Sequence, residues 1–126
     1  MSSVTGVFVD PDGSVKEHTV ENDIHEYHRL LDCDIFDITS VRVNGVRYDV
    51  FCDDEGLFKN NPKPSTVDTK GKVRVVGKCF FAGHDEEGDT VSLEGEDIEN
   101  IMDRIRMIID HNTGRCREIV MCDYDP

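Results

Sequence analysis

The sequence has few bases for its number of acids, no long apolar run and no closely spaced pair of cysteines. Its 126 residues contain 27 Asp and Glu against 14 Lys and Arg, which gives a formal charge of −13. A surface this negative repels phosphate backbones, so direct nucleic-acid binding is disfavoured unless the bases gather on one face. Five bases form a candidate patch: Lys63, Lys70, Lys72, Arg74 and Lys78. Their alternating positions also suit the solvent side of a sheet.

No run of about eighteen apolar residues, the length of a membrane-spanning helix, occurs in the chain. The first twenty residues include several charged side chains and no apolar segment that would serve as a secretion signal. These features lead us to expect a cytoplasmic protein without a membrane partner.

Five cysteines are present, and no two of them form a Cys-x-x-Cys pair. Their odd number and strand-like surroundings favour free buried thiols over a disulfide framework. The alternative is a cysteine nucleophile activated by a histidine that lies nearby in space. No sequence spacing selects such a pair.

The length and composition predict one domain over residues 1–126 that folds without a cofactor. A chain of this size has room for one core. Its hydrophobic residues, 37% of the total, cluster in runs such as "VRVVGKCFF" and "IENIMDRIRMII". Such clustering is typical of a folded rather than a disordered chain.

The first half of the chain predicts two hairpins that flank a helix. Apolar runs at 4–9 and 14–20 surround a turn-forming Asp-Pro-Asp-Gly sequence at 10–13. A helical pattern at 22–33 follows, with Asn22 or Asp23 as its N-cap. Alternating apolar residues then surround Asn44-Gly45, which is a strong signal for a hairpin turn.

The second half predicts a long loop at 57–71 and a central strand through "KVRVVGKCFFAG", in which Gly77 marks a bulge or a close backbone approach. A short strand at 90–93 and a helix that starts near residues 94–97 come next. Six apolar residues give that helix its core-facing stripe: Ile98, Ile101, Met102, Ile105, Ile108 and Ile109. Residues 112–114 are predicted to close it, and "CREIVMCDY" to form a last strand. The predicted fold is therefore α+β, an antiparallel-rich sheet of about five to seven short strands with two helices packed on it.

The stretch from 80 to 105 contains nine carboxylates before its first base, Arg104. Four of them, Glu94, Glu96, Asp97 and Glu99, fall in the first turns of the predicted helix, where the helix dipole stabilises negative charge. The other five have no such local role and are predicted to bind a partner: Asp85, Glu86, Glu87, Asp89 and Asp103.

Several short motifs occur in an order that resembles a family known as domain of unknown function 3846. They are "DDEG" at 53–56, a loop with "NNP", the stretch "VVGKCFFAGHDEEGDTVSL" and the helix start "DIENI". The resemblance covers residues 4 to 102, and 104–126 look like an extension made of the end of the second helix and a C-terminal strand. Members of that family occur in bacterial, phage and mobile-element sequences, so the resemblance implies an accessory role, and it assigns no catalytic residue.

The charge and the resemblance together predict a small acidic accessory protein that binds a basic protein. The partner would be a nucleic-acid-handling enzyme, and the protein its inhibitor or a mimic of nucleic acid. One alternative is that the acidity serves solubility or adaptation to salt, in a domain that binds a small ligand. Another is a small enzyme that uses His84 beside Asp85 with Cys79 or Cys52.

Metal binding is a further alternative. His25 and His28 lie three residues apart on the predicted first helix, which places two imidazoles near one another. The acidic turns, including "DDEG" and the Asp10–Gly13 turn, are other potential cation ligands, although the latter lacks the glycine that a calcium loop needs at its sixth position. The two histidines are also expected on the solvent-exposed face of a helix, and the acids in exposed turns. Neither position requires a metal, so no metal ligand is assigned.

Overall fold

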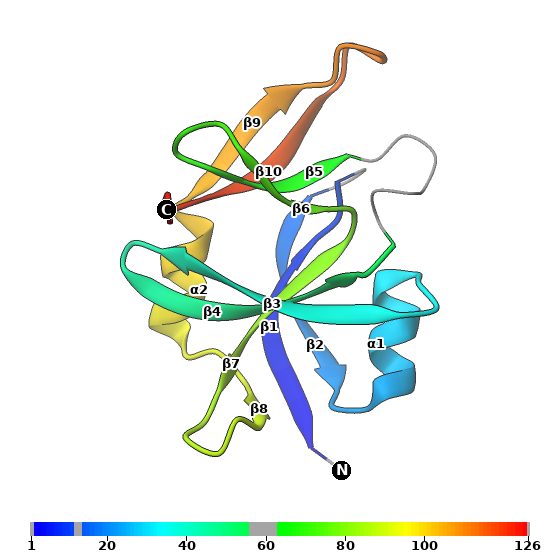
Figure 1. Cartoon of the computed structure of the whole chain (residues 1–126), viewed down its shortest axis with the longest axis vertical. Helices are drawn as coiled ribbons and strands as arrows, with labels where there is room; N and C mark the ends of the chain where they lie inside the picture. Colours follow the sequence, from blue (N-terminus) through cyan, green and yellow to red (C-terminus); the bar gives the residue numbers. More distant parts are fainter. Residues whose placement is uncertain (1, 12–13, 56–62, 126) are drawn as a thin grey trace.

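The computed structural model describes residues 2–11, 14–55 and 63–125, and these residues form ten strands and two helices. Figure 1 shows their arrangement. The elements are β1 (Ser3–Val9), β2 (Val15–Glu21), α1 (Ile24–Leu31), β3 (Phe36–Val43), β4 (Val46–Asp53), β5 (Pro64–Asp68), β6 (Val73–Val76), β7 (Cys79–His84), β8 (Thr90–Val91), α2 (Gly95–Met102), β9 (Ile105–Ile109) and β10 (Cys116–Cys122).

The strands belong to two sheets. The larger, six-stranded sheet has the order β2-β1-β7-β4-β3, with the short β8 paired to the end of β7. The smaller, four-stranded sheet has the order β6-β5-β10-β9. All described pairings are antiparallel except the parallel pair of β5 and β10.

Two apolar clusters cover the opposite faces of the six-stranded sheet. On one face, Tyr27 and Leu31 of α1 pack with Phe51 and Phe80 of the sheet. On the other face, Val50 and other sheet residues pack against α2 and the four-stranded sheet. Neighbouring residues such as Phe80 and Phe81 join different clusters because side chains alternate between the faces of a strand.

Both predicted hairpins and the first helix are confirmed. β1 pairs with β2 and β3 with β4 in continuous antiparallel register. Asn44 and Gly45 both have positive φ, 50° and 83°, as a type I′ hairpin turn requires. Asp23 is the N-cap of α1, and its side chain accepts a hydrogen bond from the backbone N–H of His25 at 3.1 Å. Residues 12 and 13 of the first turn lie outside the described residues.

The prediction of one continuous strand at 72–83 is wrong. Gly77 has a φ of 81° and ends β6, and after Lys78 the chain continues as β7. β6 is an edge strand of the smaller sheet, whereas β7 is central in the larger one. The positive φ that glycine adopts at low cost thus lets one apolar run serve two sheets.

The prediction of a helix up to residue 111 is also wrong. α2 ends at Met102, and Ile105–Ile109 forms β9, which pairs with β10. Residues 112–114 therefore lie in a hairpin turn and do not close a helix. Of the predicted stripe, Ile101 is fully buried, whereas Ile109 is 61% exposed. Isoleucine is β-branched and favours strands, and pairing with β10 decides the outcome.

The predicted loop at 57–71 is shorter in the structure. Residues 56–62 lie outside the described part of the chain, but Pro64–Asp68 forms β5 in the smaller sheet. Pro64 is the first residue of β5, a position where a strand tolerates proline. Ser65, Thr66 and Asp68 of β5 are fully or almost fully buried, so this segment is part of the interior.

The α+β class is confirmed, with two sheets where the sequence predicted one. The region after Arg104, expected to be a helix end and an added strand, is part of the packed structure. β10 lies between β5 and β9, and Val120 and Cys122 belong to the same core cluster as Val7 of β1. Within the described ranges, no helix combines the length and hydrophobicity needed to cross a bilayer.

Candidate functional site

The acidic turn, residues 85–89, connects β7 to β8. Its conformation depends on Asp85, whose Oδ1 accepts hydrogen bonds from the backbone N–H groups of Glu87 and Asp89, both at 2.9 Å. Gly88 supplies the positive φ, 86°, that the turn needs. All five residues of the turn are exposed. Asp85 therefore shapes the turn, while Glu86, Glu87 and Asp89 present their carboxylates to solvent.

The acids of α2 follow directly after β8. Glu94 is the N-cap but makes no side-chain hydrogen bond there, and Glu96 and Asp97 lie in the first turn. Asp97 accepts a hydrogen bond from the hydroxyl of Tyr48 at 2.9 Å. The others are exposed, so their stabilisation by the helix dipole leaves them open to solvent.

Asp103, the fifth predicted partner-binding residue, is separated from the acidic turn. It is the C-cap of α2, at the opposite end of the helix from β8, and it is exposed. Its backbone carbonyl accepts a hydrogen bond from Arg106 at 3.0 Å, which places it beside the smaller sheet. The structure thus brings four of the five predicted residues together in the acidic turn. Asp103 lies apart from them, between α2 and the smaller sheet.

None of the nine carboxylates in the acidic segment, residues 85–103, forms an ion pair with a described residue. The nearby histidine, His84, pairs instead with Asp49, with 3.2 Å between Nδ1 and Oδ1. Between residues 77 and 103 the sequence has one base, Lys78. The charge of this segment is therefore not neutralised within the described fold.

Bases concentrate in the smaller sheet. Residues 63–76 and 104–122, which contain its four strands, hold eight bases and three acids, a formal charge of +5. The remainder of the sequence holds six bases and twenty-four acids, a formal charge of −18. Four of the five bases of the predicted patch, all but Lys78, belong to this sheet and its turns. Lys63, Arg115 and Arg117 also line a hollow of about 520 Å³ beside the β9–β10 hairpin. Positive charge is therefore concentrated in the smaller sheet, and negative charge in the rest of the chain.

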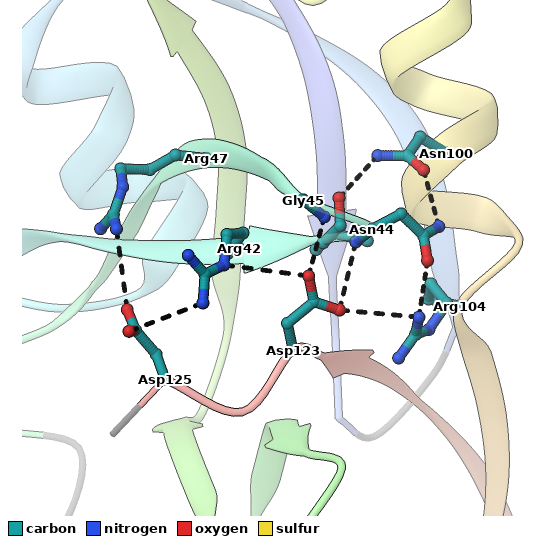
Figure 2. A network of polar contacts seen from close by, with 9 residues as sticks. Arg42, Asn44, Gly45, Arg47, Asn100, Arg104, Asp123 and Asp125 are labelled. Atoms are coloured by element: carbon teal, nitrogen blue, oxygen red, sulfur yellow. Dashed lines mark hydrogen bonds and ion pairs between the residues drawn. The ribbon is translucent and has the colours of Figure 1, made fainter.

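A polar network at the carboxyl end of the chain, shown in Figure 2, joins segments that are distant in the sequence. The carboxylate of Asp123 accepts hydrogen bonds from the backbone N–H groups of Asn44 and Gly45, at 3.2 and 2.8 Å. It also lies 3.7 Å from Nη1 of Arg104. Asp125 pairs with Arg42, again at 3.7 Å. Asp123 thus fixes the β3–β4 turn, and Asp123 and Asp125 together form ion pairs with Arg42, Arg47 and Arg104.

The same network continues into α2. The side chain of Asn44 donates to Asn100 Oδ1 at 2.7 Å and accepts from Arg104 at 2.7 Å. Asn100 in turn donates to the hydroxyl of Tyr48 and to the carbonyl of Val43, at 2.9 and 3.0 Å. The pKa of Tyr48 is raised to about 12, mainly by burial and also by Asp97, while the hydrogen bond from Asn100 acts to lower it. The network therefore sets the position of the acidic helix.

The thiols and the histidine of the hypothetical enzyme do not converge. Burial raises the pKa of Cys79 to about 12 and that of Cys52 to about 11. Cys79 is the first residue of β7 and His84 is the last, and Cys52 lies opposite Cys79 on β4. Both thiols are therefore at the other end of β7 from the histidine. None of the five cysteines is in a disulfide. The prediction of buried thiols is confirmed for Cys79 and Cys122, whereas Cys33 and Cys52 are half-buried and Cys116 is exposed.

The residues named as potential metal ligands are dispersed. Within residues 2–11, 14–55 and 63–125, no group of three or more His, Cys, Asp or Glu side chains is placed to hold a metal ion. His28 packs edge-on against Phe36, with ring centroids 5.2 Å apart, while His25 is exposed. The carboxylate of Asp53 in "DDEG" accepts the backbone N–H of Glu55 at 2.9 Å, as in an ordinary turn.

Sequence reasoning missed the role of Asp123, Asn100 and Arg104. Asn44-Gly45 identifies the turn that they hold, but nothing in the local pattern links that turn to a carboxylate 79 residues later. Sequence spacing carries no signal for such long-range contacts.

Comparison with protein-family models identifies a match. The sequence model of the family described as "Domain of unknown function (DUF3846)" matches residues 4–106. The match includes the acidic segment and stops within β9, so Asp123 and Asp125 lie beyond it. No curated protein and no solved structure matches the chain. With the family model spanning most of its length, the chain belongs to the DUF3846 family of domains of unknown function.

Proposed function

We propose that this protein is a non-enzymatic accessory protein that binds a basic surface on another protein through its acidic segment. The observation that carries the proposal is that nine carboxylates lie on residues 85–103 and none has an ion pair with a described residue. A surface with one sign of charge steers molecules of the opposite charge towards it.

The polarised charge supports a specific surface over a uniformly acidic one. The smaller sheet has a formal charge of +5, and the bases Arg42, Arg47 and Arg104 are held by Asp123 and Asp125. A basic partner is therefore attracted to the side of α2 and β8 and repelled by the smaller sheet. Such asymmetry orients an encounter and raises its rate.

The class of partner we favour is a protein that itself handles nucleic acid. Such proteins gather Lys and Arg on one face to contact phosphates. A row of exposed carboxylates competes for the same face, and inhibition by mimicry of nucleic acid would follow. An origin in phage or mobile elements is part of this proposal.

The test uses two matched triple variants as bait. Glu86→Gln, Glu87→Gln and Asp89→Asn remove three exposed charges from the acidic turn and retain Asp85, which shapes it. The control removes the same types of charge elsewhere, with three substitutions at exposed residues: Glu17→Gln, Asp34→Asn and Glu55→Gln. Both variants have the same net charge.

Each bait is exposed to a nuclease-treated lysate of the source cells and washed in steps of rising salt. A protein retained by the native chain is then purified, and its Kd is measured against all three baits at several salt concentrations. We expect the turn variant to weaken binding at least about tenfold and the control to have little effect, with affinity falling as salt rises. Equal losses for both variants, or affinity that does not change with salt, would favour the solubility explanation of the acidity.

A further inference from the structure

β9 is an edge strand, and its outer edge is open. It is the last strand of the smaller sheet, and β10 is its only strand partner among the described residues. In Figure 1 the β9–β10 hairpin projects along the long axis, away from the larger sheet. An open edge presents backbone donors and acceptors that pair readily with another strand.

The backbone groups on this edge can be assigned from the register. Hydrogen bonds from Asp110 N–H to Arg115 and from Met121 N–H to Arg104 fix which residues of β9 face β10. In an antiparallel pair, alternate residues point their N–H and C=O groups to the same side. Ile105, Met107 and Ile109 therefore present theirs to the open edge.

The side chains of these three residues lie on one face of the strand, since they are two positions apart. Met107 and Ile109 are each 61% exposed, the highest values among the large hydrophobic residues of the described chain. Ile105 is partly buried against the core cluster. The open edge thus combines backbone groups that have no strand partner among the described residues with an exposed apolar strip.

The residues around β9 are complementary to a second copy in antiparallel orientation. A two-fold axis at Met107 places Met107 opposite itself and Ile105 opposite Ile109 of the other copy. The same register places Arg104 opposite Asp110 and Asp103 opposite His111. Apolar residues thus meet apolar residues, and no two like charges stand opposite one another, which is compatible with a cross-strand interface. Arg104 and Asp110 already contact Asp123 and Lys63 within one chain, so the apolar strip is the main source of the complementarity.

The charge of the edge is also suited to self-association. Residues 103–111 hold two acids and two bases and have no formal net charge, whereas the whole chain has −13. Two copies therefore meet at a neutral surface, with Asp103 as the one acid of the acidic segment that lies at the contact and the acidic turn, residues 85–89, on another strand pair. Arg106 donates to the carbonyls of Asp103 and Ile105, at 3.0 and 2.9 Å, which partly covers the edge in the single chain.

From these features we infer that two copies of the protein pair through β9, joining their four-stranded sheets into one continuous sheet. The contact has six backbone hydrogen bonds, from the outward groups of Ile105, Met107 and Ile109 in each copy, and Arg106 has to release or share the carbonyl of Ile105. The inference is independent of the proposed function, because it uses the opposite part of the charge distribution. The two also respond oppositely to salt. Screening weakens attraction between the acidic segment and a basic partner, but it strengthens pairing between two copies of net charge −13.

The test exploits the two-fold axis at Met107. Met107→Lys and Met107→Glu each place like charges opposite one another, and a mixture of the two variants places opposite charges there. The control is Val73→Lys, which changes a 42% exposed residue on β6, the other edge strand of the same sheet. Mass is measured by sedimentation equilibrium over a range of protein and salt concentrations, after circular dichroism has verified that each variant is folded.

The native chain and Val73→Lys are expected to form dimers that tighten as salt rises. Each Met107 variant alone should raise the dimer Kd at least about tenfold, and mixing the two should restore dimers. Amide exchange at Met107 and Ile109 should slow as protein concentration rises. A native chain that stays monomeric up to millimolar concentration, or dimers that both Met107 variants leave intact, would overturn the inference. So would pairing of Met107→Lys with Met107→Glu that is no tighter than either variant with itself.

Discussion

The carboxylate of Asp123 accepts a hydrogen bond at 2.8 Å from the backbone N–H of Gly45, a residue 78 positions earlier in the chain. The same carboxylate accepts from Asn44, and both donors belong to the tight turn between β3 and β4. A residue beyond the family match thereby fixes a turn within it.

Asp123→Asn is expected to destabilise the protein. The amide side chain is neutral, offers one oxygen, and meets two N–H donors and the nearby Arg104. We expect a loss of about 1–3 kcal/mol in the free energy of unfolding, measured by urea denaturation. The control is Asp125→Asn, which removes two ion pairs of 3.7 Å on a partly exposed side chain and should cost less than about 1 kcal/mol. Equal losses would show that Asp123 acts only as a surface charge.

Gly6→Ala should disrupt the centre of the larger sheet. A methyl group at Gly6 would overlap the backbone carbonyl oxygen of Phe81 and lie 2.9 Å from the buried Phe80 ring. The free energy of unfolding should fall by about 1–3 kcal/mol or more.

Gly95→Ala is the matched control, because nothing lies within 4 Å of the added methyl at the start of α2. It should be neutral or slightly stabilising, since alanine favours a helix over glycine. Thermal melts of both variants decide the point, and a Gly6→Ala protein as stable as the native one would contradict the close packing of β1 on β7.

The cysteines should differ in their reaction with a thiol reagent at pH 8. Cys116 is exposed, whereas burial raises the pKa of Cys79 to about 12 and also raises that of Cys122. The thiolate is the reacting form, so buried thiols with raised pKa values react slowly until the protein unfolds.

Colour release from an aromatic disulfide reagent should thus show a fast phase that Cys116→Ser removes. The slow thiols should react at once in denaturant. A fast phase that persists in Cys116→Ser, with the variant still folded, would require another accessible thiol.

Tyr48 should make stability depend on alkaline pH. Its pKa is raised from 10 to about 12 in the folded state, mainly by burial, so the folded chain holds the phenolic proton more tightly than the unfolded chain. Stability from this group is complete below pH 10 and is lost as the pH rises towards 12.

Tyr48→Phe should be less stable at neutral pH, because Asn100 and Asp97 lose a hydrogen-bond partner, yet should lose less stability between pH 10 and 12. Urea denaturation midpoints across this range measure both effects. If the urea midpoints of the native chain and the variant fall in parallel between pH 10 and 12, Tyr48 is not the group that causes the alkaline loss of stability.

Local sequence signals determined much of the first half of the fold. Asn44-Gly45 specified a hairpin because both residues tolerate positive φ, and Asp23 specified the start of α1 through its side-chain cap. The composition of 85–89 specified an exposed acidic turn. These features depend on contacts within a few residues, which a sequence displays directly.

Only the tertiary structure decided where the second half changes from helix to strand and from one sheet to the other. The spacing of Ile101, Ile105 and Ile108 suits a helix, but pairing with β10 makes Ile105–Ile109 a strand. Gly77 permits a change of chain direction. Only the packing of the two sheets decides that β6, before it, and β7, after it, belong to different sheets. Likewise, the sequence determined that the chain is acidic, whereas the fold gathered eight of its fourteen bases in one sheet and left the acidic segment without an ion pair to a described residue. Charge is a property of composition, but its separation into two surfaces arises from contacts between residues distant along the chain.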